Sequence, residues 1–439
     1  MLGSYGLPHR WRPTRLSVAS PRHKLKIAIW HNLPSGGGKR ALNHLVSGLV
    51  ARGHDIEAWC PSTADRSYLP MEQLIREHVI QLSWDQPETR EGLSYLIWRY
   101  GETADKIAAM DRHCEQCLAE ISAGGFDVLF AHPCTFFRVT AVARFAKIPT
   151  VLYLQEPNRD LYEASPRLPW LALPRRSRRA WTPYAIRRAL KDLVDIRALR
   201  LQAREECDNA AAFDQILVNS YFSRESVLRA YGLDSRVCYL GVATERFRPL
   251  GLPRERFVVG LGAIHPSKGL ETAVEAVATI PERRRPELHW VGNFANSRYH
   301  KEINALAKSL AVKFVPRVAL SDEEVVDLLN RAAVMIYTSH LEPFGLAPLE
   351  AGACETPVVA IAEGGVRESI LDGLNGILVP ERRPELIGRA LIRFLDEPAL
   401  ARTVGERARA YVVENWTWER AVECVERSLI EVAMKRKAS

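Results

Sequence analysis

The hydrophobic pattern in the first half of the chain alternates between two kinds of segment. Short apolar runs rich in β-branched residues predict strands at residues 26–30, 56–59, 127–131, 150–154 and 215–219. Between the first two strands, residues 39–52 place their apolar side chains on one face at helical spacing. Strands that alternate with helices are typical of an α/β fold with a parallel sheet.

The same alternation begins again in the second half. Further strands are predicted at residues 257–262, 288–291, 312–315, 334–337, 357–361 and 376–379, with a helix at 270–280. Residues 241–256 contain Pro249, Gly251 and Pro253 and few apolar residues, so they predict a linker. A last helical stretch, 398–434, is long enough to cross back onto the first half. The fold class is therefore α/β, with two doubly wound domains that face each other and bind ligand at the carboxyl ends of their strands.

The net charge of +8 is concentrated in two segments. The composition of the 439 residues, 47% hydrophobic and 26% charged, is ordinary for a globular protein and excludes disordered, collagen-like and disulfide-rich classes. Residues 1–26 carry +6 and residues 167–204 carry +9, which leaves −7 for the remainder. A nucleic-acid-binding protein would spread its excess over the whole binding domain, so no nucleic-acid partner is expected.

Residues 160–210 interrupt the α/β pattern as a basic insertion. They include a run of Arg175, Arg176, Arg178 and Arg179 among aromatic residues, followed by a predicted helix. Two interpretations stay open for this segment. It is either a solvated insertion or, over residues 167–204, a docking surface for an anionic membrane or a phosphate-bearing acceptor.

The ends and the cysteines indicate a cytoplasmic protein. Residues 1–25 contain prolines and arginines but no signal-peptide core, so we expect a flexible basic tail. No window approaches the roughly 18 apolar residues that span a bilayer. The eight cysteines lie mostly in apolar runs, as small buried hydrophobes do. Cys114 and Cys117 form a lone C-x-x-C without the further ligands that zinc needs, so no metal is expected there.

Three glycines follow the first predicted strand. Gly36, Gly37 and Gly38 precede a helix, where they allow a ligand to approach the backbone closely or simply make a tight turn. They do not form G-x-G-x-x-G, and no acidic residue follows at the spacing of a dinucleotide site. A nicotinamide-dependent oxidoreductase is therefore not favoured.

The second half carries two sharper motifs. Gly262 to Gly269 leads from a strand end into a helix start, and it includes Lys268 where a diphosphate would lie on the helix N-terminus. After the strand at 334–337, Glu342 and Glu350 flank a predicted helix start, with Glu350 expected in the first turn. Backbone amides near Gly345 and Leu346 would point toward an anion, and Glu350 could accept hydrogen bonds from sugar hydroxyls.

These motifs resemble glycosyltransferase family 4, whose members are retaining enzymes with the GT-B fold of two Rossmann-like domains. Glu342 and Glu350, with seven residues between them, resemble its E-x7-E motif. Five weaker matches accompany it: the glycine loop at 36–38, Asn219-Ser220 with Phe222-Ser223, Gly241-Val242 before Phe247-Arg248-Pro249, Lys268-Gly269, and Gly364-Gly365 with Glu368. Together they cover roughly residues 25–435.

The resemblance implies a division into parts. We expect a tail at 1–25, an N-terminal acceptor-side domain at 26–245 and a nucleotide-sugar-binding domain at 246–410. A C-terminal helix at 411–439 would cross back to the first domain.

The resemblance also implies roles for individual residues on the donor side. Lys268 would hold the donor diphosphate, Glu350 the ribose hydroxyls, and Glu342 the transferred sugar near its anomeric centre. The implied donor set is Gly262, Lys268, Arg317, Val318, Glu342, Phe344, Gly345, Leu346 and Glu350, in which the segment 315–318 contacts the base through its backbone.

On the acceptor side, the implied set is Gly36, Gly37, Gly38, His132, Gln155, Glu156 and Arg159. The implied catalytic residues of the whole site are Glu342, Lys268 and Gln155. No cofactor is required, because the leaving diphosphate can itself receive the acceptor proton.

The sequence departs from the family pattern at two positions. The family usually has an arginine five residues before the lysine, where this chain has Ala263; Arg367 could replace that cation. Many members have a histidine where this chain has Gln155, which can bind a hydroxyl but cannot act as a base.

The function expected from these features is transfer of a sugar from a nucleotide-diphosphate sugar to a sugar, lipid-linked or other hydroxyl acceptor. Such transfer would serve surface glycan or glycolipid synthesis, in the cytoplasm or at the inner face of the membrane. A sugar-nucleotide epimerase of the same fold is an alternative, although Gln155 argues against it. A non-catalytic sugar-nucleotide-binding relative is another, motivated by Ala263 and Gln155.

Overall fold

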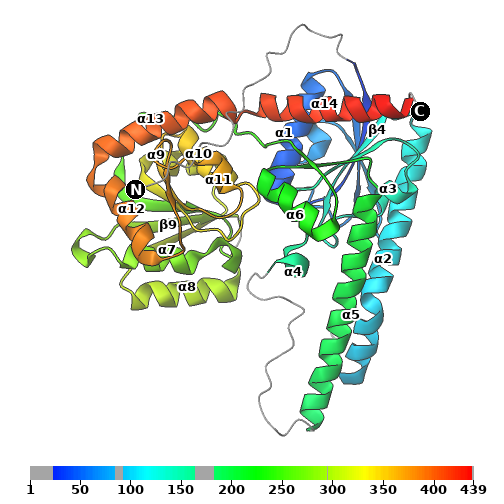
Figure 1. Ribbon diagram of the computed structural model, residues 1–439, viewed down its shortest axis with the longest axis horizontal. Helices are drawn as coiled ribbons and strands as arrows, with labels where there is room; N and C mark the ends of the chain where they lie inside the picture. The colour runs from blue at the N-terminus through cyan, green and yellow to red at the C-terminus, as the bar shows by residue number, and fades with distance from the viewer. Residues whose placement is uncertain (1–22, 85–91, 164–181, 294, 438–439) are drawn as a thin grey trace, which may run out of the picture.

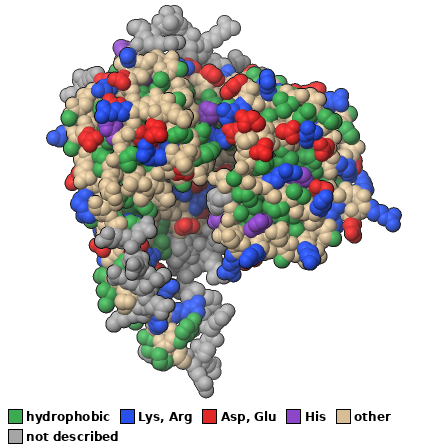
Figure 2. All heavy atoms as spheres, turned by 180° about the vertical axis from the view of Figure 1, so that it is seen from behind, with side chains coloured by type: hydrophobic (Ala, Val, Ile, Leu, Met, Phe, Trp, Pro, Cys, Tyr) green, Lys and Arg blue, Asp and Glu red, His purple; other side chains and the backbone are tan. Residues whose placement is uncertain are grey.

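The protein folds into two α/β domains that lie side by side (Figure 1). The computed structural model describes residues 23–84, 92–163, 182–293 and 295–437. Space-filling atoms form two lobes with a hollow between them (Figure 2). The expected tail therefore lies outside the described residues except for 23–25, and so do Arg175, Arg176, Arg178 and Arg179.

The first domain is built on a seven-stranded parallel sheet in the order β3-β2-β1-β4-β5-β6-β7. Its strands are β1 (Lys26–Asn32), β2 (Asp55–Pro61), β3 (Arg76–Ile80), β4 (Val128–Cys134), β5 (Thr150–Tyr153), β6 (Gln215–Val218) and β7 (Arg236–Val237). Its helices are α1 (Gly37–Ala51), α2 (Gly92–Ala123), α3 (Val142–Phe145), α4 (Arg159–Tyr162), α5 (Pro183–Ala211) and α6 (Tyr221–Tyr231), with a 3-10 turn η1 (Met71–Gln73).

The second domain is built on a six-stranded parallel sheet in the order β10-β9-β8-β11-β12-β13. Its strands are β8 (Glu255–Leu261), β9 (Glu287–Gly292), β10 (Phe314–Val318), β11 (Ala332–Tyr337), β12 (Val358–Ile361) and β13 (Ile377–Val379). Its helices are α7 (Leu270–Ala278), α8 (Ser297–Ser309), α9 (Asp322–Arg331), α10 (Leu346–Ala353), α11 (Val366–Ser369), α12 (Pro384–Asp396) and α13 (Pro398–Asn415), with 3-10 turns η2 (Pro266–Lys268) and η3 (Glu282–Arg284).

The α/β prediction is confirmed, with differences at the edges of both sheets. β3 and β7 were missed because β3 carries charged side chains and β7 is only two residues long, so neither has an apolar run. β10 begins two residues later than predicted and includes Arg317 and Val318, which therefore lie in the strand rather than in a loop.

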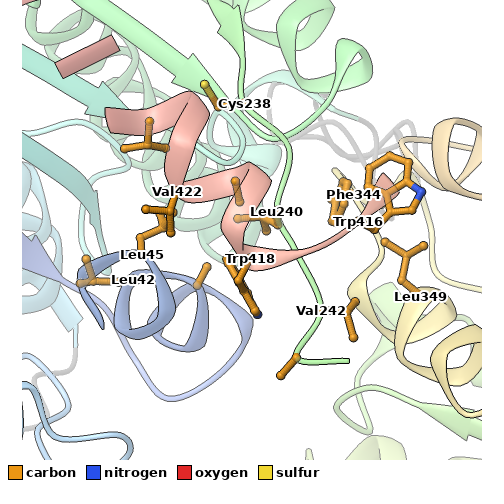
Figure 3. Close-up of a cluster of buried hydrophobic side chains, with 14 of the residues drawn as sticks. Leu42, Leu45, Cys238, Leu240, Val242, Phe344, Leu349, Trp416, Trp418 and Val422 are labelled. Atoms are coloured by element: carbon orange, nitrogen blue, oxygen red, sulfur yellow. The ribbon is translucent and has the colours of Figure 1, made fainter. Parts of the chain in front are cut away.

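The predicted helical stretch 398–434 is two helices rather than one. α13 ends at Asn415, and α14 (Trp418–Lys437) then crosses onto the first domain, where it packs on α1 (Figure 3). The crossing is sealed by apolar contacts: Trp418 stacks on His44, with ring centroids 4.5 Å apart, and the Trp416 ring lies 5.4 Å from that of Phe344. α14 therefore joins the two cores.

Cys238 and Cys424 form a disulfide between the segment after β7 and α14. The sequence predicted cysteines that mostly pack as small buried hydrophobes, and this pair is instead crosslinked. Their positions, 186 residues apart, meet only in the folded chain. Cys114 and Cys117 are free and buried, as expected.

Helices α2 and α5 start far from the sheet and run parallel to each other toward it, so that together they project from the first domain (Figure 1). The described part of the basic insertion is thus mainly one long helix. No helix in the described part of the chain is long and apolar enough to cross a bilayer.

Candidate functional site

Lys268 lies in a tight turn at the carboxyl end of β8. The turn η2 ends at Gly269, whose left-handed conformation (φ 64°) starts α7. A Cβ atom at Gly262 would lie 3.2 Å from the Lys268 side chain, so the glycine leaves room for it. The Thr338 hydroxyl donates to the Lys268 carbonyl (3.0 Å), and the His340 N–H donates to the Ser267 carbonyl (2.9 Å). The turn is therefore fixed against the loop that follows β11.

That loop carries Glu342, whose carboxylate accepts a hydrogen bond from the Lys268 ammonium at 2.6 Å. Both side chains are about one-fifth exposed. Burial would raise the pKa of Glu342, but the Lys268 and Arg159 charges hold this pKa below its ordinary value. The site therefore keeps an ionised carboxylate next to two cations.

Gly364 and Gly365, in the loop after β12, lie directly against the Glu342 loop. A Cβ atom at Gly364 would collide with the Glu342 backbone, and one at Gly365 with the Pro343 carbonyl. The Gly365 N–H also donates to the Glu342 carbonyl at 2.8 Å. The paired glycines are thus needed because two backbone segments touch here.

The loop leads into α10, which begins after Gly345 (φ 90°). Phe344 is buried in the core, so only its backbone can face a ligand, while Leu346 is half-buried. Glu350 lies in the second turn, which corrects the expected first-turn position. Burial and the nearby Asp322 raise the pKa of Glu350, and Arg40 opposes them.

Within the described part of the chain, the Glu350 carboxylate makes no hydrogen bond or ion pair. A half-buried acceptor of this kind is suited to ligand hydroxyls. Arg317 and Val318 are exposed at the carboxyl end of β10, the edge strand of the same sheet.

On the first domain, the glycine loop lies between Gln155 and the second domain. A Cβ atom at Gly38 would lie 3.3 Å from the Gln155 amide nitrogen, and one at Gly36 would lie 3.8 Å from the Asn293 amide nitrogen. The buried Nε2 of Gln155 has no partner among the described residues. Gln155 and the glycine loop are therefore adjacent, as an acceptor site requires.

His132 is fully enclosed near the end of β4, with its ring centroid 4.6 Å from that of Phe130. Burial, together with His31 and Lys39, lowers the pKa of His132 to about 3, so its imidazole is neutral. Neither ring nitrogen has a partner in the described chain. His132 can thus offer one donor and one acceptor, but no charge.

Lys39 was missed by the sequence reasoning. Its side chain is fully buried beneath the first turn of α1, and its ammonium has no hydrogen-bond partner among the residues described. Burial lowers the pKa of Lys39, although the negative charge of Glu77 acts to raise it. The sequence signal was its position directly after the three glycines, on the face expected to be apolar.

Arg159 links the two domains. Although it follows the acceptor-side loop, its guanidinium donates to the carbonyls of His340 (3.0 Å) and Leu341 and to the Glu156 carboxylate (2.6 Å). Arg159 therefore supplies the second positive charge near Glu342. Arg367, expected to compensate for Ala263, is exposed and donates to the Gly364 carbonyl instead.

Two further cross-domain contacts hold the lobes together. Arg40 of α1 pairs with Asp322 of α9 at 2.6 Å. Glu368 accepts hydrogen bonds from the backbone N–H groups of Tyr221 and Phe222, both at 2.9 Å, and so caps α6 from the other domain. The motif residue Glu368 therefore serves the domain interface.

One group in the described chain has the composition of a metal site. Ligand atoms of His31, Cys60 and Glu77 lie within 4.8 Å of one another. Glu77 is already bound by His31 (3.0 Å) and by Arg66 (3.0 Å), and the Lys39 charge lies nearby. The Arg66 and Lys39 charges oppose a metal ion, so the group fits a buried hydrogen-bonded cluster better.

Sequence comparison places similarity to a known family in the second domain. Residues 243–411 match the profile of the family described as "Glycosyl transferases group 1". D-inositol 3-phosphate glycosyltransferase of Streptomyces bingchenggensis is 32% identical over 249 residues, or 51% of this chain and 54% of that protein. The protein of the same name from Acidothermus cellulolyticus is 35% identical over 242 residues, or 50% and 53%. The chain thus spans about half the length of these relatives.

Solved structures resemble the whole chain. Sucrose-phosphate synthase from Thermosynechococcus elongatus superimposes with a TM-score of 0.65 at 20% identity, covering 95% of this chain and 100% of that one. Anabaena HepE in complex with UDP-glucose gives a TM-score of 0.63 at 18% identity, covering 94% and 100%. These similarities establish the GT-B fold of two Rossmann-like domains.

Proposed function

We propose that the protein is a retaining glycosyltransferase that moves a sugar from a nucleotide-diphosphate sugar to an acceptor hydroxyl. The observation that carries the proposal is the Lys268–Glu342 contact, which lies at the carboxyl ends of the strands in the domain that matches the "Glycosyl transferases group 1" family. The HepE structures with UDP and UDP-glucose support a nucleotide-sugar donor.

The donor diphosphate would bind at Lys268 and the start of α10. One N–H of the Lys268 ammonium goes to Glu342, which leaves two for phosphate oxygens. The amides of Gly345 and Leu346 would add hydrogen bonds and the favourable end of the helix dipole. Glu350 would bind the ribose hydroxyls, and the end of β10 at Arg317 and Val318 would contact the base.

The chemistry would rest on leaving-group stabilisation. As the bond from the anomeric carbon to the phosphate oxygen breaks, negative charge on the diphosphate is stabilised by Lys268 and the α10 amides. The ionised Glu342 would stabilise the positive charge that develops at the anomeric carbon. The acceptor oxygen attacks from the face that the diphosphate leaves, and its proton passes to the departing phosphate oxygen. No base and no metal is needed for this step.

The acceptor would bind to the first domain. Gly38 lies against Gln155, Glu156 pairs with Arg159, and the enclosed His132 has two ring nitrogens without a partner among the described residues. The relatives' name, D-inositol 3-phosphate glycosyltransferase, makes a phosphorylated polyol the first acceptor to test. A lipid-linked sugar acceptor, in glycolipid or surface glycan synthesis at the inner face of the membrane, is the second.

The experiment is a matrix of donors and acceptors. The protein is incubated with radiolabelled UDP-glucose, UDP-GlcNAc and GDP-mannose, each with inositol phosphate or lipid-linked sugars, while calorimetry measures UDP and GDP binding. We expect one nucleotide to bind and one product to retain the donor's anomeric configuration by NMR. An absence of nucleotide binding would refute the proposal. Release of an epimerised free sugar without acceptor would instead favour an epimerase.

A further inference from the structure

The outer parts of α2 and α5 form an arm that contributes no residue to the proposed sugar-transfer site. The arm comprises residues 92–106 of α2 and 183–204 of α5. The two helices are held together by polar contacts: Arg99 pairs with Asp195 (3.0 Å), and Arg197 donates to the Tyr100 carbonyl (2.6 Å). The Arg197 guanidinium also lies 3.8 Å from the centroid of the Tyr100 ring. The arm is therefore an ordered projection.

The outward side of α5 carries an apolar row at the free end of the arm. Ile186, Leu190 and Leu193 are spaced four and three residues apart, so they lie on one side of the helix. Their exposed fractions are 45%, 48% and 64%. On α2, Ile97 is 68% exposed, and Tyr184 at the start of α5 is 72% exposed. Large apolar side chains gathered at one protruding end indicate a surface that binds something.

The same row continues toward the domain as arginines. Arg197 follows Leu193 by four residues, but its guanidinium is bound at Tyr100 of α2. Arg200 and Arg204 follow at spacings of three and four residues and are exposed. The side that faces α2 is different, since it contains Asp195 and the buried Ala198. Along the outward side of α5, the side chains are thus apolar at the tip and basic nearer the sheet.

The charge of this helix is strongly positive. Over residues 183–204, six cations face only two carboxylates, Asp192 and Asp195, of which Asp195 is bound by Arg99. Three of the cations (Arg187, Arg188 and Lys191) are exposed at the tip, among the apolar side chains. Hydrophobic and basic side chains are seen together at this end of the molecule in Figure 2.

We infer that the arm binds the surface of an anionic phospholipid bilayer, with its tip inserted. At about 1.5 Å rise per residue, the row from Ile186 to Leu193 is about 10 Å long. When a helix lies in the interface, its apolar face enters the headgroup region by roughly 5–10 Å, and this row supplies such a face. The exposed Arg200 and Arg204 continue the same side of α5, where cations are attracted to the lipid phosphates.

Charge complementarity selects this partner over another copy of the chain. Two arms packed tip to tip would bring like charges together, which opposes association. A nucleic acid would use the arginines but leave the apolar row in water. An anionic bilayer satisfies both parts of the arm. The inference does not depend on sugar transfer, because the arm shares no residue with the proposed site.

The test is flotation of the whole protein with vesicles of phosphatidylcholine alone or with added phosphatidylglycerol. We expect binding to the anionic vesicles, weakened by salt. The double variant Leu190→Ser/Leu193→Ser should lose at least about tenfold in affinity, because it removes apolar side chains from the inserted tip. Arg200→Gln/Arg204→Gln should lose several-fold on anionic vesicles only.

Matched controls lie elsewhere on the surface. Leu228→Ser on α6 removes a leucine that is 56% exposed, and Arg298→Gln on α8 removes an exposed cation; both should bind like the unmodified protein. Circular dichroism checks that the arm variants stay folded. The inference is overturned if the unmodified protein does not bind anionic vesicles, or if the Leu190→Ser/Leu193→Ser variant binds them with unchanged affinity. It is also overturned if that variant abolishes a dimer seen by analytical ultracentrifugation, which would identify a second copy as the partner.

Discussion

The Nζ atom of Lys268 lies 2.6 Å from Oε2 of Glu342, joining the turn after β8 to the loop after β11. Together with the Arg159 charge, the contact holds the pKa of Glu342 below its ordinary value, although burial would raise it. It also fixes the lysine beside the loop that leads into α10. The two residues are 74 positions apart, so only the fold brings them together.

Glu342→Gln should reduce kcat about 100-fold or more, because it removes charge that stabilises the transition state. UDP affinity should change little, since the ammonium of Lys268 remains for the phosphates. Steady-state kinetics and UDP calorimetry measure the two effects. Glu323→Gln, an exposed carboxylate on α9, is the control and should behave like the unmodified protein. A Glu342→Gln variant with normal kcat would exclude a catalytic role.

Glu350→Gln should stabilise the protein while weakening nucleotide binding. Because the folded protein raises the pKa of Glu350, it holds this proton more tightly than the unfolded chain does. The free energy of unfolding therefore falls as the pH rises from the ordinary glutamate pKa to the raised one. In the variant, the free energy of unfolding should not fall over this pH range. The variant should therefore melt at a higher temperature than the unmodified protein at neutral pH.

The same Glu350→Gln change should lower UDP affinity about tenfold through weaker bonds to the ribose hydroxyls. Melting curves between acid and neutral pH and UDP calorimetry test both parts, with the exposed Glu414→Gln as the control. A melting temperature that falls at neutral pH would contradict the burial argument.

Gly38→Ala should impair acceptor binding selectively. The new methyl group would lie 3.3 Å from Nε2 of Gln155 and push that amide out of position. A side-chain displacement costing about 0.5–1.5 kcal/mol corresponds to a rise in acceptor KM of about twofold to tenfold. Donor KM and melting temperature should not worsen, since alanine is favoured over glycine in a helix. Gly37→Ala is the matched control, because nothing lies within 4 Å of its new methyl group.

Glu368→Ala should weaken the domain interface. The carboxylate accepts from the N–H groups of Tyr221 and Phe222 and from the Tyr239 hydroxyl, at 2.8–2.9 Å. Losing these charge-assisted bonds should cost about 1.5–3 kcal/mol of unfolding free energy, measured by denaturant titration. Small-angle scattering should show a larger radius of gyration. Glu414→Ala is the control, and unchanged stability of the Glu368 variant would show that the cap contributes nothing.

Reduction should destabilise the protein through Cys238 and Cys424. Denatured but unreduced protein should show six reactive thiols, against eight after reduction. Reduction should lower the free energy of unfolding by about 2–4 kcal/mol, because the unfolded chain regains the freedom that the crosslink removes. The variant Cys238→Ser should already be destabilised and insensitive to reductant. Eight thiols in the unreduced protein would show that the pair is free.

The sequence by itself determined the α/β class, most of the strands and the motif residues of the site. Buried parallel strands need continuous apolar runs, and tight turns at their carboxyl ends need glycine, so both leave local marks, as at residues 257–262 and at Gly269. The edge strand β3 has no continuous apolar run, because its side chains are partly solvated and charged.

Only the tertiary structure decided which of these residues meet. It brought Arg159 from the other domain to Glu342, turned Glu368 into a cap for α6, and placed Glu350 one turn further along its helix than expected. It also buried Lys39 and joined Cys238 to Cys424. The physical reason is that local pattern reports the burial of a residue within its own element, whereas charge pairing, capping and crosslinking depend on distances between elements that packing sets.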